Sequence, residues 1–407
     1  MNERGHASLV HRSTDATSLS SLRPTTRAVV RELLRAGPLS RADLARRLDL
    51  SPASLTKLTR PLVNSGLVRE ESAQSARPGR PGAPLAMDVG RHRFLGMKVT
   101  GDELFGVSTD AGGAVQEVAH RDLLSTDVTT VSRVIVEMVN ELDPKGIAQA
   151  LGIGLAGRML HFDDTVRDNG YLGWDDVPLA RLINDATGVP TVLSGDARAL
   201  TAGVQWSGPG RGYDDFAVVT IGVGIGVGLV LGGQVRAGGH GTAGHVGHTP
   251  VTDSGPLCEL GHRGCAASLL NAEAISRSIG VPHGRADLDL AGAVALAEAG
   301  DLAALRALTD AGRALGTLIA SIVNLLDLPA VILAGDGLGI MPVARAAMAA
   351  ALSEHLDPGT RAPHIEEFDS TFDEWARGAA VVACQWVLAA PETVGTHRPT
   401  ERAPSGI

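Results

Sequence analysis

Two glycine-rich runs lie close together in the second half of the chain. They read Val-Thr-Ile-Gly-Val-Gly-Ile-Gly-Val-Gly-Leu-Val-Leu-Gly-Gly at residues 219–233 and Gly-Gly-His-Gly-Thr-Ala-Gly-His-Val-Gly-His at residues 238–248. The first run joins two short apolar stretches, 216–221 and 228–231, that we interpret as strands. Glycines at strand ends, in a chain where strands alternate with helices, predict two related α/β lobes around a cleft.

The same alternation extends outward from these runs in both directions. Besides the two strands above, short apolar runs predict strands at 94–99, 104–109, 150–155, 189–193 and 330–334. Helical spacing of apolar residues predicts helices at 131–142, 179–187, 302–326 and 372–389.

The composition is that of a globular protein of two or three domains. The chain has 407 residues, 44% of them hydrophobic, with few aromatics and 50 glycines, so its cores are built mainly from Ala, Val and Leu. Three cysteines do not make a disulfide framework in a chain of this size. There is no apolar run of 18 residues and no signal-peptide core near the N-terminus. We therefore expect a cytoplasmic protein without membrane insertion.

Charge is distributed unevenly along the chain. Residues 1–86 contain 14 Lys and Arg against 7 Asp and Glu, a net charge of +7, whereas the remainder carries −16. A basic module attached to an acidic body is typical of a protein that binds a polyanion through one domain. A basic but inert helical domain is the alternative.

Three helical patterns follow one another within the basic module. Gly37-Pro38 ends the first. Ser40-Arg-Ala-Asp43 is a capping box with the shorter acid, and Ser51-Pro52 supplies an N-cap followed by a proline in the first turn. Three short helices joined in this way predict a helix-turn-helix.

The third helix, which begins at Pro52, is the predicted recognition helix. Leu55, Leu58 and Leu62 form its apolar face. Hydroxyls, lysine and arginine on the opposite face suit a major groove, where they reach base edges and phosphates. The residues that we expect to contact DNA from this helix are Ser54, Thr56, Lys57 and Arg60.

A predicted wing completes the module. A short strand begins at Leu67, and the basic turn Arg77-Pro-Gly-Arg-Pro81 follows it. Prolines and Gly79 hold Arg77 and Arg80 in a rigid turn, where they can contact the backbone or a minor groove of double-stranded operator DNA. A winged helix that serves only protein contacts is the alternative.

Beyond residue 90 the ordered motifs resemble the ROK family of repressors and sugar kinases. Besides the two runs quoted above, the resemblance rests on Gly152-Ile-Gly-Leu-Ala-Gly157, Gly173-Trp-Asp-Asp-Val-Pro-Leu179, Gly195-Asp-Ala197, Gly255-Pro-Leu-Cys258, Gly264-Cys265 and Leu333-Ala-Gly335. It covers roughly residues 92–390, and with the winged helix in front the whole chain resembles the repressor branch. The resemblance implies a two-lobed actin/hexokinase-like (ribonuclease H-like) domain whose C-terminal helix packs back on the first lobe.

These features together divide the chain into four segments. We expect a flexible arm at 1–22, the winged helix-turn-helix at 23–86, the ROK domain at 87–390 and a flexible tail at 391–407. Within the ROK domain, the first lobe is expected at about 87–199 together with the helix 372–390, and the second at about 200–371.

The phosphate-binding motifs of the kinase members are altered here. Kinases carry Asp-x-Gly-Gly-Thr-Lys in the first hairpin turn, which Lys98-Val-Thr-Gly-Asp-Glu103 matches with the charges at both ends reversed. A second motif, Gly-Thr-Gly, is Gly222-Val-Gly224, and a lysine in place of the acid repels a magnesium complex. The carboxylate that takes the sugar proton survives as Asp196, but its usual Asn partner is Gly195. We expect no catalytic residues and no ATP binding; an active sugar kinase is the alternative.

The resemblance also implies a sugar pocket, in which two acids are missing. The glutamate that the family offers to sugar hydroxyls is His245 here, and a second falls at Ala267. This loss argues against an ordinary glucose-like effector. A modified sugar, a sugar phosphate paired with His245 or Arg198, and no ligand at all are open alternatives. The candidate effector-binding residues are Asp196, His245, His248 and Asn169, with Trp174 nearby.

A zinc site is implied by the same resemblance. His248, Cys258 and Cys265 match three of the four ligands of the family's structural zinc site, and Leu260 stands at the remaining cysteine. His262 or a water can complete the four, or zinc has been lost. Cys384 lies on an apolar helix and is expected in the core.

The best hypothesis is a DNA-binding transcriptional regulator, expected to repress carbohydrate-related genes. Two winged helices of a homodimer or higher homo-oligomer would address a palindromic operator. A constitutive DNA-binding protein with a degenerate ligand pocket is a third hypothesis.

Overall fold

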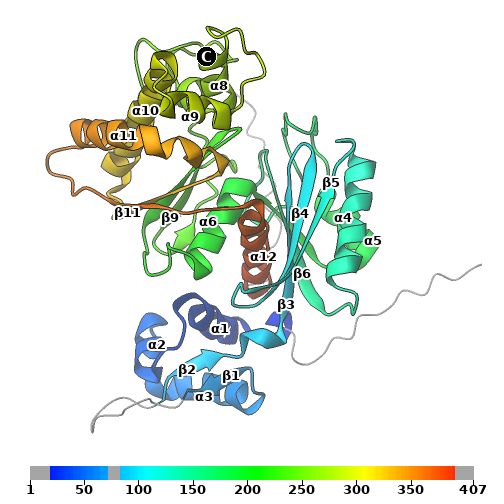
Figure 1. Ribbon diagram of the computed structural model, residues 1–407. Helices are drawn as coiled ribbons and strands as arrows, with labels where there is room; N and C mark the ends of the chain where they lie inside the picture. The colour runs from blue at the N-terminus through cyan, green and yellow to red at the C-terminus, as the bar shows by residue number, and fades with distance from the viewer. Residues whose placement is uncertain (1–18, 72–82, 390–407) are drawn as a thin grey trace, which may run out of the picture. The chain divides into compact units, whose positions relative to one another are not determined.

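The computed structural model describes residues 19–71 and 83–389, which form two compact units (Figure 1). One unit contains the chain up to Arg91 and the residues from Cys384 onward, and the other runs from His92 to Ala383. No helix in the described part of the chain is long and apolar enough to cross a membrane.

The first unit contains the winged helix-turn-helix. A buried core formed mainly by Val29, Val30, Leu33, Leu44 and Leu55 holds its helices together. The strands β1 and β2 pair in antiparallel fashion, with Val68 opposite Met87. Its elements are α1 (Pro24–Ala36), α2 (Arg41–Arg47), α3 (Pro52–Asn64), β1 (Val68–Glu70) and β2 (Leu85–Met87), with 3-10 turns at Leu19–Ser21 and Val89–Arg91. The predicted helix-turn-helix is confirmed.

The second unit is built on two five-stranded sheets with the same connectivity. In each sheet the first three strands along the chain pair in antiparallel fashion. The fourth strand pairs in parallel with the first, and the fifth pairs in parallel with the fourth. One sheet has the order β5-β4-β3-β6-β7, formed by β3 (Arg93–Val99), β4 (Glu103–Asp110), β5 (Val115–Asp122), β6 (Ala148–Leu155) and β7 (Thr191–Gly195). The other has the order β10-β9-β8-β11-β12, formed by β8 (Phe216–Ile221), β9 (Ile225–Leu231), β10 (Gln234–Val235), β11 (Ala330–Ala334) and β12 (His364–Glu367). This repetition confirms the two related lobes.

Helices cover the outer face of each sheet. α4 (Val128–Leu142) and α5 (Leu179–Thr187) share a core with the first sheet. The second sheet shares a larger core with α7 (Ala266–Leu270), α8 (Ala272–Gly280), α9 (Leu290–Glu298), α10 (Leu302–Leu326) and α11 (Met341–His355), and a 3-10 turn covers Asp336–Ile340.

Two further helices, α6 (Asp196–Ser207) and α12 (Phe372–Leu388), lie between the sheets (Figure 1). Glycines allow α12 to approach the first sheet closely. A methyl group on Gly96 of β3 would lie 2.0 Å from the carbonyl oxygen of Ala376, and one on Gly152 of β6 would lie 1.9 Å from that of Ala379. The prediction that the C-terminal helix packs back on the first lobe is therefore confirmed, and Cys384 on this helix is buried as expected.

Candidate functional site

The predicted recognition helix α3 is capped as its sequence indicates. The Ser51 hydroxyl accepts a hydrogen bond from the backbone N–H of Ser54 at 3.2 Å, and Pro52 occupies the first turn. The helix continues through Pro61 to Asn64. Ser51 therefore supplies an acceptor for one of the N–H groups that the first turn leaves unbonded.

The buried face of α3 differs slightly from the expected one. Leu55, Thr59 and Leu62 are buried, whereas Leu58 is only half-buried. Thr59 tolerates burial because its hydroxyl donates to the carbonyl of Leu55 at 3.0 Å. The four predicted DNA contacts on this helix, Ser54, Thr56, Lys57 and Arg60, are all exposed.

The two cations of α3 have no acidic partner among the described residues. Neighbouring arginines do have one: Arg41 pairs with Glu70 at 2.5 Å, and Arg47 pairs with Glu32 at 2.9 Å. Lys57 and Arg60 thus present unneutralised charge to solvent, as contact with phosphates requires. Arg77 and Arg80, the predicted wing contacts, lie outside the described residues.

In the second unit, Lys98 and Asp196 form an ion pair. Lys98 lies on β3, Asp196 is the first residue of α6, and the Lys98 Nζ to Asp196 Oδ2 distance is 2.5 Å. The other carboxylate oxygen accepts from the backbone N–H of Ala197 at 2.7 Å. Burial acts to raise the pKa of Asp196, but the charge and hydrogen bond of Lys98 and the backbone N–H groups of Ala197 and Asp196 together outweigh burial, and the pKa is lowered. Asp196 is therefore a weak base, poorly suited to take a proton from a sugar hydroxyl.

The glycine loop between β8 and β9 is occupied by side chains. A methyl group on Gly222 would lie 2.0 Å from Asp336 Oδ1, so this carboxylate rests against the loop backbone. The Tyr171 hydroxyl lies 3.5 Å from the corresponding position at Gly224. Asn271 donates to the carbonyl of Val223 at 2.5 Å. A carboxylate in this place repels a phosphate.

Sequence reasoning missed Tyr171, Asp336 and Asn271. Asp336 directly follows the Leu333-Ala-Gly335 motif, so an acid next to a glycine turn was the available signal. No local signal marked Tyr171, whose pKa is raised by partial burial and by the carboxylates of Glu259, Asp196 and Glu273.

The other predicted effector residues are in different surroundings. Asn169 is 2% exposed, and its amide donates to the carbonyl of Ala156 and accepts from the N–H of Leu172. This side chain thus holds a turn. His245 and His248 are exposed.

Arg198, which the sequence suggested as a partner for a sugar phosphate, donates its hydrogen bonds to other groups of the protein. One nitrogen donates to the carbonyls of Met159 and Leu160, both at 3.1 Å, and another to the Ser194 hydroxyl at 3.3 Å. Burial lowers the pKa of Arg198 to about 10.

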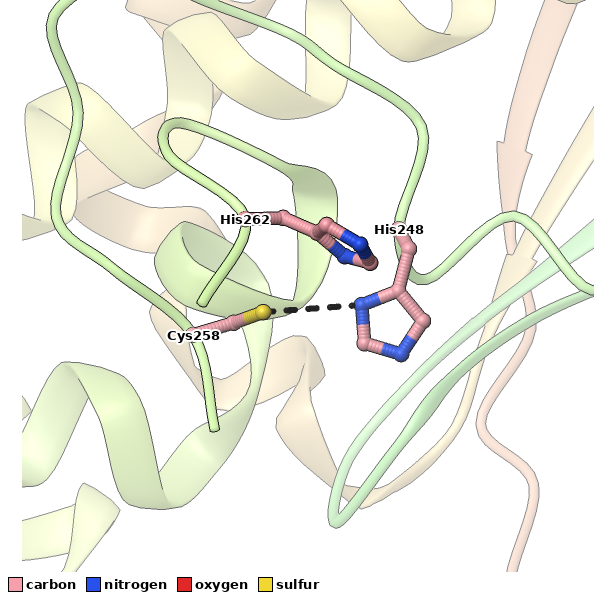
Figure 2. Close-up of side chains that lie close together, drawn as sticks. All are labelled: His248, Cys258 and His262. Atoms are coloured by element: carbon pink, nitrogen blue, oxygen red, sulfur yellow. Dashed lines mark hydrogen bonds between the residues drawn. The ribbon is translucent and has the colours of Figure 1, made fainter. Parts of the chain in front are cut away.

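A histidine and cysteine cluster occupies the loop after the second glycine-rich run (Figure 2). The Cys258 Sγ lies 3.6 Å and the Cys265 Sγ 3.9 Å from the Nδ1 of His248. His262 lies near two of these residues: ligand atoms of His248, Cys258 and His262 all lie within 4.8 Å of one another, a group that does not include Cys265. Leu260, at the position of the missing cysteine, is exposed. The backbone turn that ends at Cys265 thus places the imidazole of His262 in a cluster where Leu260 stands in place of a cysteine.

Comparisons with known proteins agree with this architecture. The ROK family matches residues 95–385, and the winged helix-turn-helix DNA-binding family matches residues 22–69. The chain is 25% identical to the xylose repressor of Bacillus subtilis over 309 residues, covering 75% of this chain and 80% of that protein. It is 28% identical to the DNA-binding transcriptional repressor Mlc of Escherichia coli over 336 residues, covering 76% and 80%.

Solved structures show the same fold. A ROK family transcriptional regulator, described as a homologue of the Escherichia coli Mlc protein, superposes with a TM-score of 0.76 at 24% identity, covering 89% of this chain and 96% of that one. A ROK hexokinase from Thermus thermophilus superposes with a TM-score of 0.64 at 26% identity, covering 72% and 99%. The chain belongs to the ROK family, and with its winged helix-turn-helix it is a DNA-binding transcriptional regulator of that family.

Proposed function

We propose that the protein acts in the cytoplasm as a repressor of carbohydrate-related genes. The observation that carries the proposal is the exposed face of α3, where Lys57 and Arg60 have no acidic partner among residues 19–71 and 83–389. The names of the relatives, a xylose repressor and the repressor Mlc, support the proposal that the target genes concern carbohydrates.

Genome-wide mapping of bound DNA tests this proposal. We expect enrichment upstream of genes for carbohydrate uptake or breakdown, and increased transcription of those genes when the protein is deleted. The matched control is the double variant Lys57→Ala, Arg60→Ala, which keeps the fold but removes the free charge. Sites that are bound equally by this variant would contradict the assignment of α3.

Binding as a homodimer or higher homo-oligomer is part of the proposal. A winged helix contacts one half-site, and two half-sites in a palindrome require two copies related by symmetry. Sedimentation of the full chain with and without a mapped operator measures the stoichiometry. One chain per palindrome would contradict it.

We also propose that the protein does not phosphorylate sugars. Lys98 neutralises the carboxylate that would act as base, and Asp336 places negative charge against the glycine loop. We expect no sugar phosphate above a heat-killed control when the protein is incubated with MgATP and common hexoses. Sugar phosphate that disappears with Asp196→Asn would establish a kinase instead.

An effector of the carbohydrate class is proposed to bind near Asp196. Because His245 replaces an acid of the family, the site lacks one fixed negative charge that would repel an anionic ligand. Anionic or acylated sugars should therefore bind better than neutral hexoses.

Operator affinity, measured with and without each sugar of a panel, tests the effector. Asp196→Ala should abolish any response to the sugars, and His245→Glu should favour neutral sugars. A strong response of the wild type to glucose would contradict the specificity. An unchanged response in Asp196→Ala would place the effector elsewhere.

Zinc is the proposed metal of the histidine and cysteine cluster. Two thiols and two imidazoles, from Cys258, Cys265, His248 and His262, are a donor set that zinc prefers in closed structural sites. When bound, zinc would fold the loop 248–265 by joining its two ends.

Elemental analysis of protein purified without chelator measures the metal. We expect up to one zinc per chain, and a loss with Cys258→Ser or His262→Ala. Leu260→Cys is the matched gain variant and should tighten binding. A zinc content equal to that of Cys258→Ser would show that the site is not a metal site.

A further inference from the structure

The helix α12 has one end beside the Lys98–Asp196 pair. We propose that α12 transmits the state of this ion pair to the winged helix, with Lys98 as the residue that senses the ligand and Arg27 as the residue that receives the signal. The proposal rests on the proposed function, because it requires a DNA-binding regulator that responds to a ligand.

Lys98 contacts both Asp196 and the helix α12. Its ammonium bonds Asp196 and lies 5.1 Å from the ring centroid of Trp375, in the first turn of α12. Lys98 and Trp375 are 6% and 8% exposed, whereas the Asp196 side chain is 27% exposed. A ligand hydroxyl therefore reaches Asp196 first and competes with Lys98 for the carboxylate. When the ammonium shifts, the packing of Trp375 must change.

Trp375 has no polar contact that would fix it. Its indole Nε1 is buried without a hydrogen-bond partner in the described part of the chain. A buried donor without an acceptor is costly. The position of this ring therefore depends on Lys98 and the surrounding apolar side chains.

The body of α12 contacts α6 with no space between them. α6 begins at Asp196, and a methyl group on Gly378 of α12 would lie 2.2 Å from the carbonyl oxygen of Ala199. Arg377 of α12 also donates to the hydroxyl of Ser207, the last residue of α6. Together with the contacts of α12 to Gly96 and Gly152, this close packing means that α12 responds as a rigid body rather than by local bending.

The far end of α12 is bonded to the first helix of the winged helix-turn-helix. α12 is one continuous helix of 17 residues, and its last residues, from Cys384, belong to the same compact unit as α1. Directly after it, the carbonyl of Ala389 accepts from the Arg27 guanidinium at 2.6 Å. Arg27 is 8% exposed and also donates to the carbonyl of Leu22. Since a helix C-terminus carries partial negative charge, this arginine is a fitting partner for it.

Hydrogen exchange of the full chain tests the route without any ligand. In Lys98→Met we expect amides of the last turn of α12 and of α1 to exchange about fivefold faster or more. Asp196→Asn, which weakens the same ion pair, should change the same amides. Arg345→Met is the matched control, because it breaks an ion pair with Glu367 away from α12 and should leave both segments unchanged. Changes confined to β3 and α6 in Lys98→Met would overturn the proposal.

A double-variant cycle on a mapped operator adds a functional measurement. Effects of distant residues without shared contacts multiply independently. We expect the operator affinity of the double variant Lys98→Met, Arg27→Lys to differ by about fivefold or more from the product of the two single effects. The double variant Arg345→Met, Arg27→Lys should match that product. Independent effects of Lys98 and Arg27 would overturn the coupling. If the wild type bound no DNA, the proposed function would fail, while hydrogen exchange would still decide the route.

Discussion

The same residue type has opposite roles in the two units. On α3, Lys57 and Arg60 are exposed and have no acidic partner in the described part of the chain. On β3, Lys98 is 6% exposed and bonded to Asp196. The first charges remain available to a polyanion, whereas the second neutralises the carboxylate of Asp196. Location, rather than residue type, thus separates an exposed charge from a buried, paired one.

The largest effect is expected from removing the free charges. Arg60→Ala should weaken operator binding by about 1–3 kcal/mol. Adding Lys57→Ala to this variant should weaken binding further by a similar amount. The slope of log affinity against log salt should also decrease, since fewer counterions are released. Titrations at several salt concentrations measure both.

The control for this experiment is Arg313→Ala, which removes an exposed charge from α10 in the other unit. Unchanged affinity in both α3 variants would mean that the recognition helix lies elsewhere.

Removing the buried charge should instead affect stability. Lys98→Met leaves the Asp196 carboxylate without its cation and should lower the free energy of unfolding by about 1–3 kcal/mol at pH 7. Urea unfolding measures the difference from the wild type. An equal loss in Lys57→Met, whose side chain is exposed, would remove the distinction between the two lysines.

The same pair predicts a pH dependence. Because the pKa of Asp196 in the folded protein is below its ordinary value of 3.8, the stabilisation is complete above that value and is lost as the pH falls through the lowered pKa. The stability difference between wild type and Lys98→Met should be largest near neutral pH and shrink as the pH falls through the pKa of Asp196, first in the variant, where burial acts without the lysine, and then in the wild type. A difference that does not change at all between about pH 7 and about pH 3 would mean that Lys98 acts through packing alone.

An exposed ion pair supplies the smallest expected effect. His283 Nε2 lies 2.9 Å from Asp301 Oδ2, and the carbonyl of Ile279 and this carboxylate raise the pKa of His283. Its contribution is therefore present below the ordinary value of 6.5 and lost as the pH rises through the raised pKa. His283→Gln should lower the unfolding midpoint slightly at pH 6 and leave it unchanged at pH 8.

Most elements of the fold could be predicted, because their signals are local. The helix α5 and the strands β8 and β11 have the bounds that their apolar patterns indicate. In contrast, β5 was missed because nearly all its residues are exposed, so no alternation of apolar and polar residues marks it. The helix α6 was also missed, because its residues from Ala199 to Trp206 are all buried, so no separation of apolar and polar faces marks it.

The candidate site was predicted less completely than the fold. The sequence predicted His248, Cys258 and Cys265 in one cluster, and the structure brings these three together. The sequence left open whether His262 or a water completes the cluster or zinc has been lost, and the structure places the imidazole of His262 near His248 and Cys258. The position of the His262 side chain depends on a turn of only a few residues, and the direction of that turn depends on packing.

Local signals in the sequence are sufficient for the capped helix α3 and the two α/β lobes, because each depends on neighbouring residues and on the backbone preferences of Gly, Pro and Ser. Only the tertiary structure decided that Lys98 bonds Asp196, 98 residues away, and rests against Trp375. It alone also placed Asp336 against Gly222. Such contacts join strands and helices that are distant in the chain, so their geometry is set by how the two sheets and α12 pack, which no local pattern encodes.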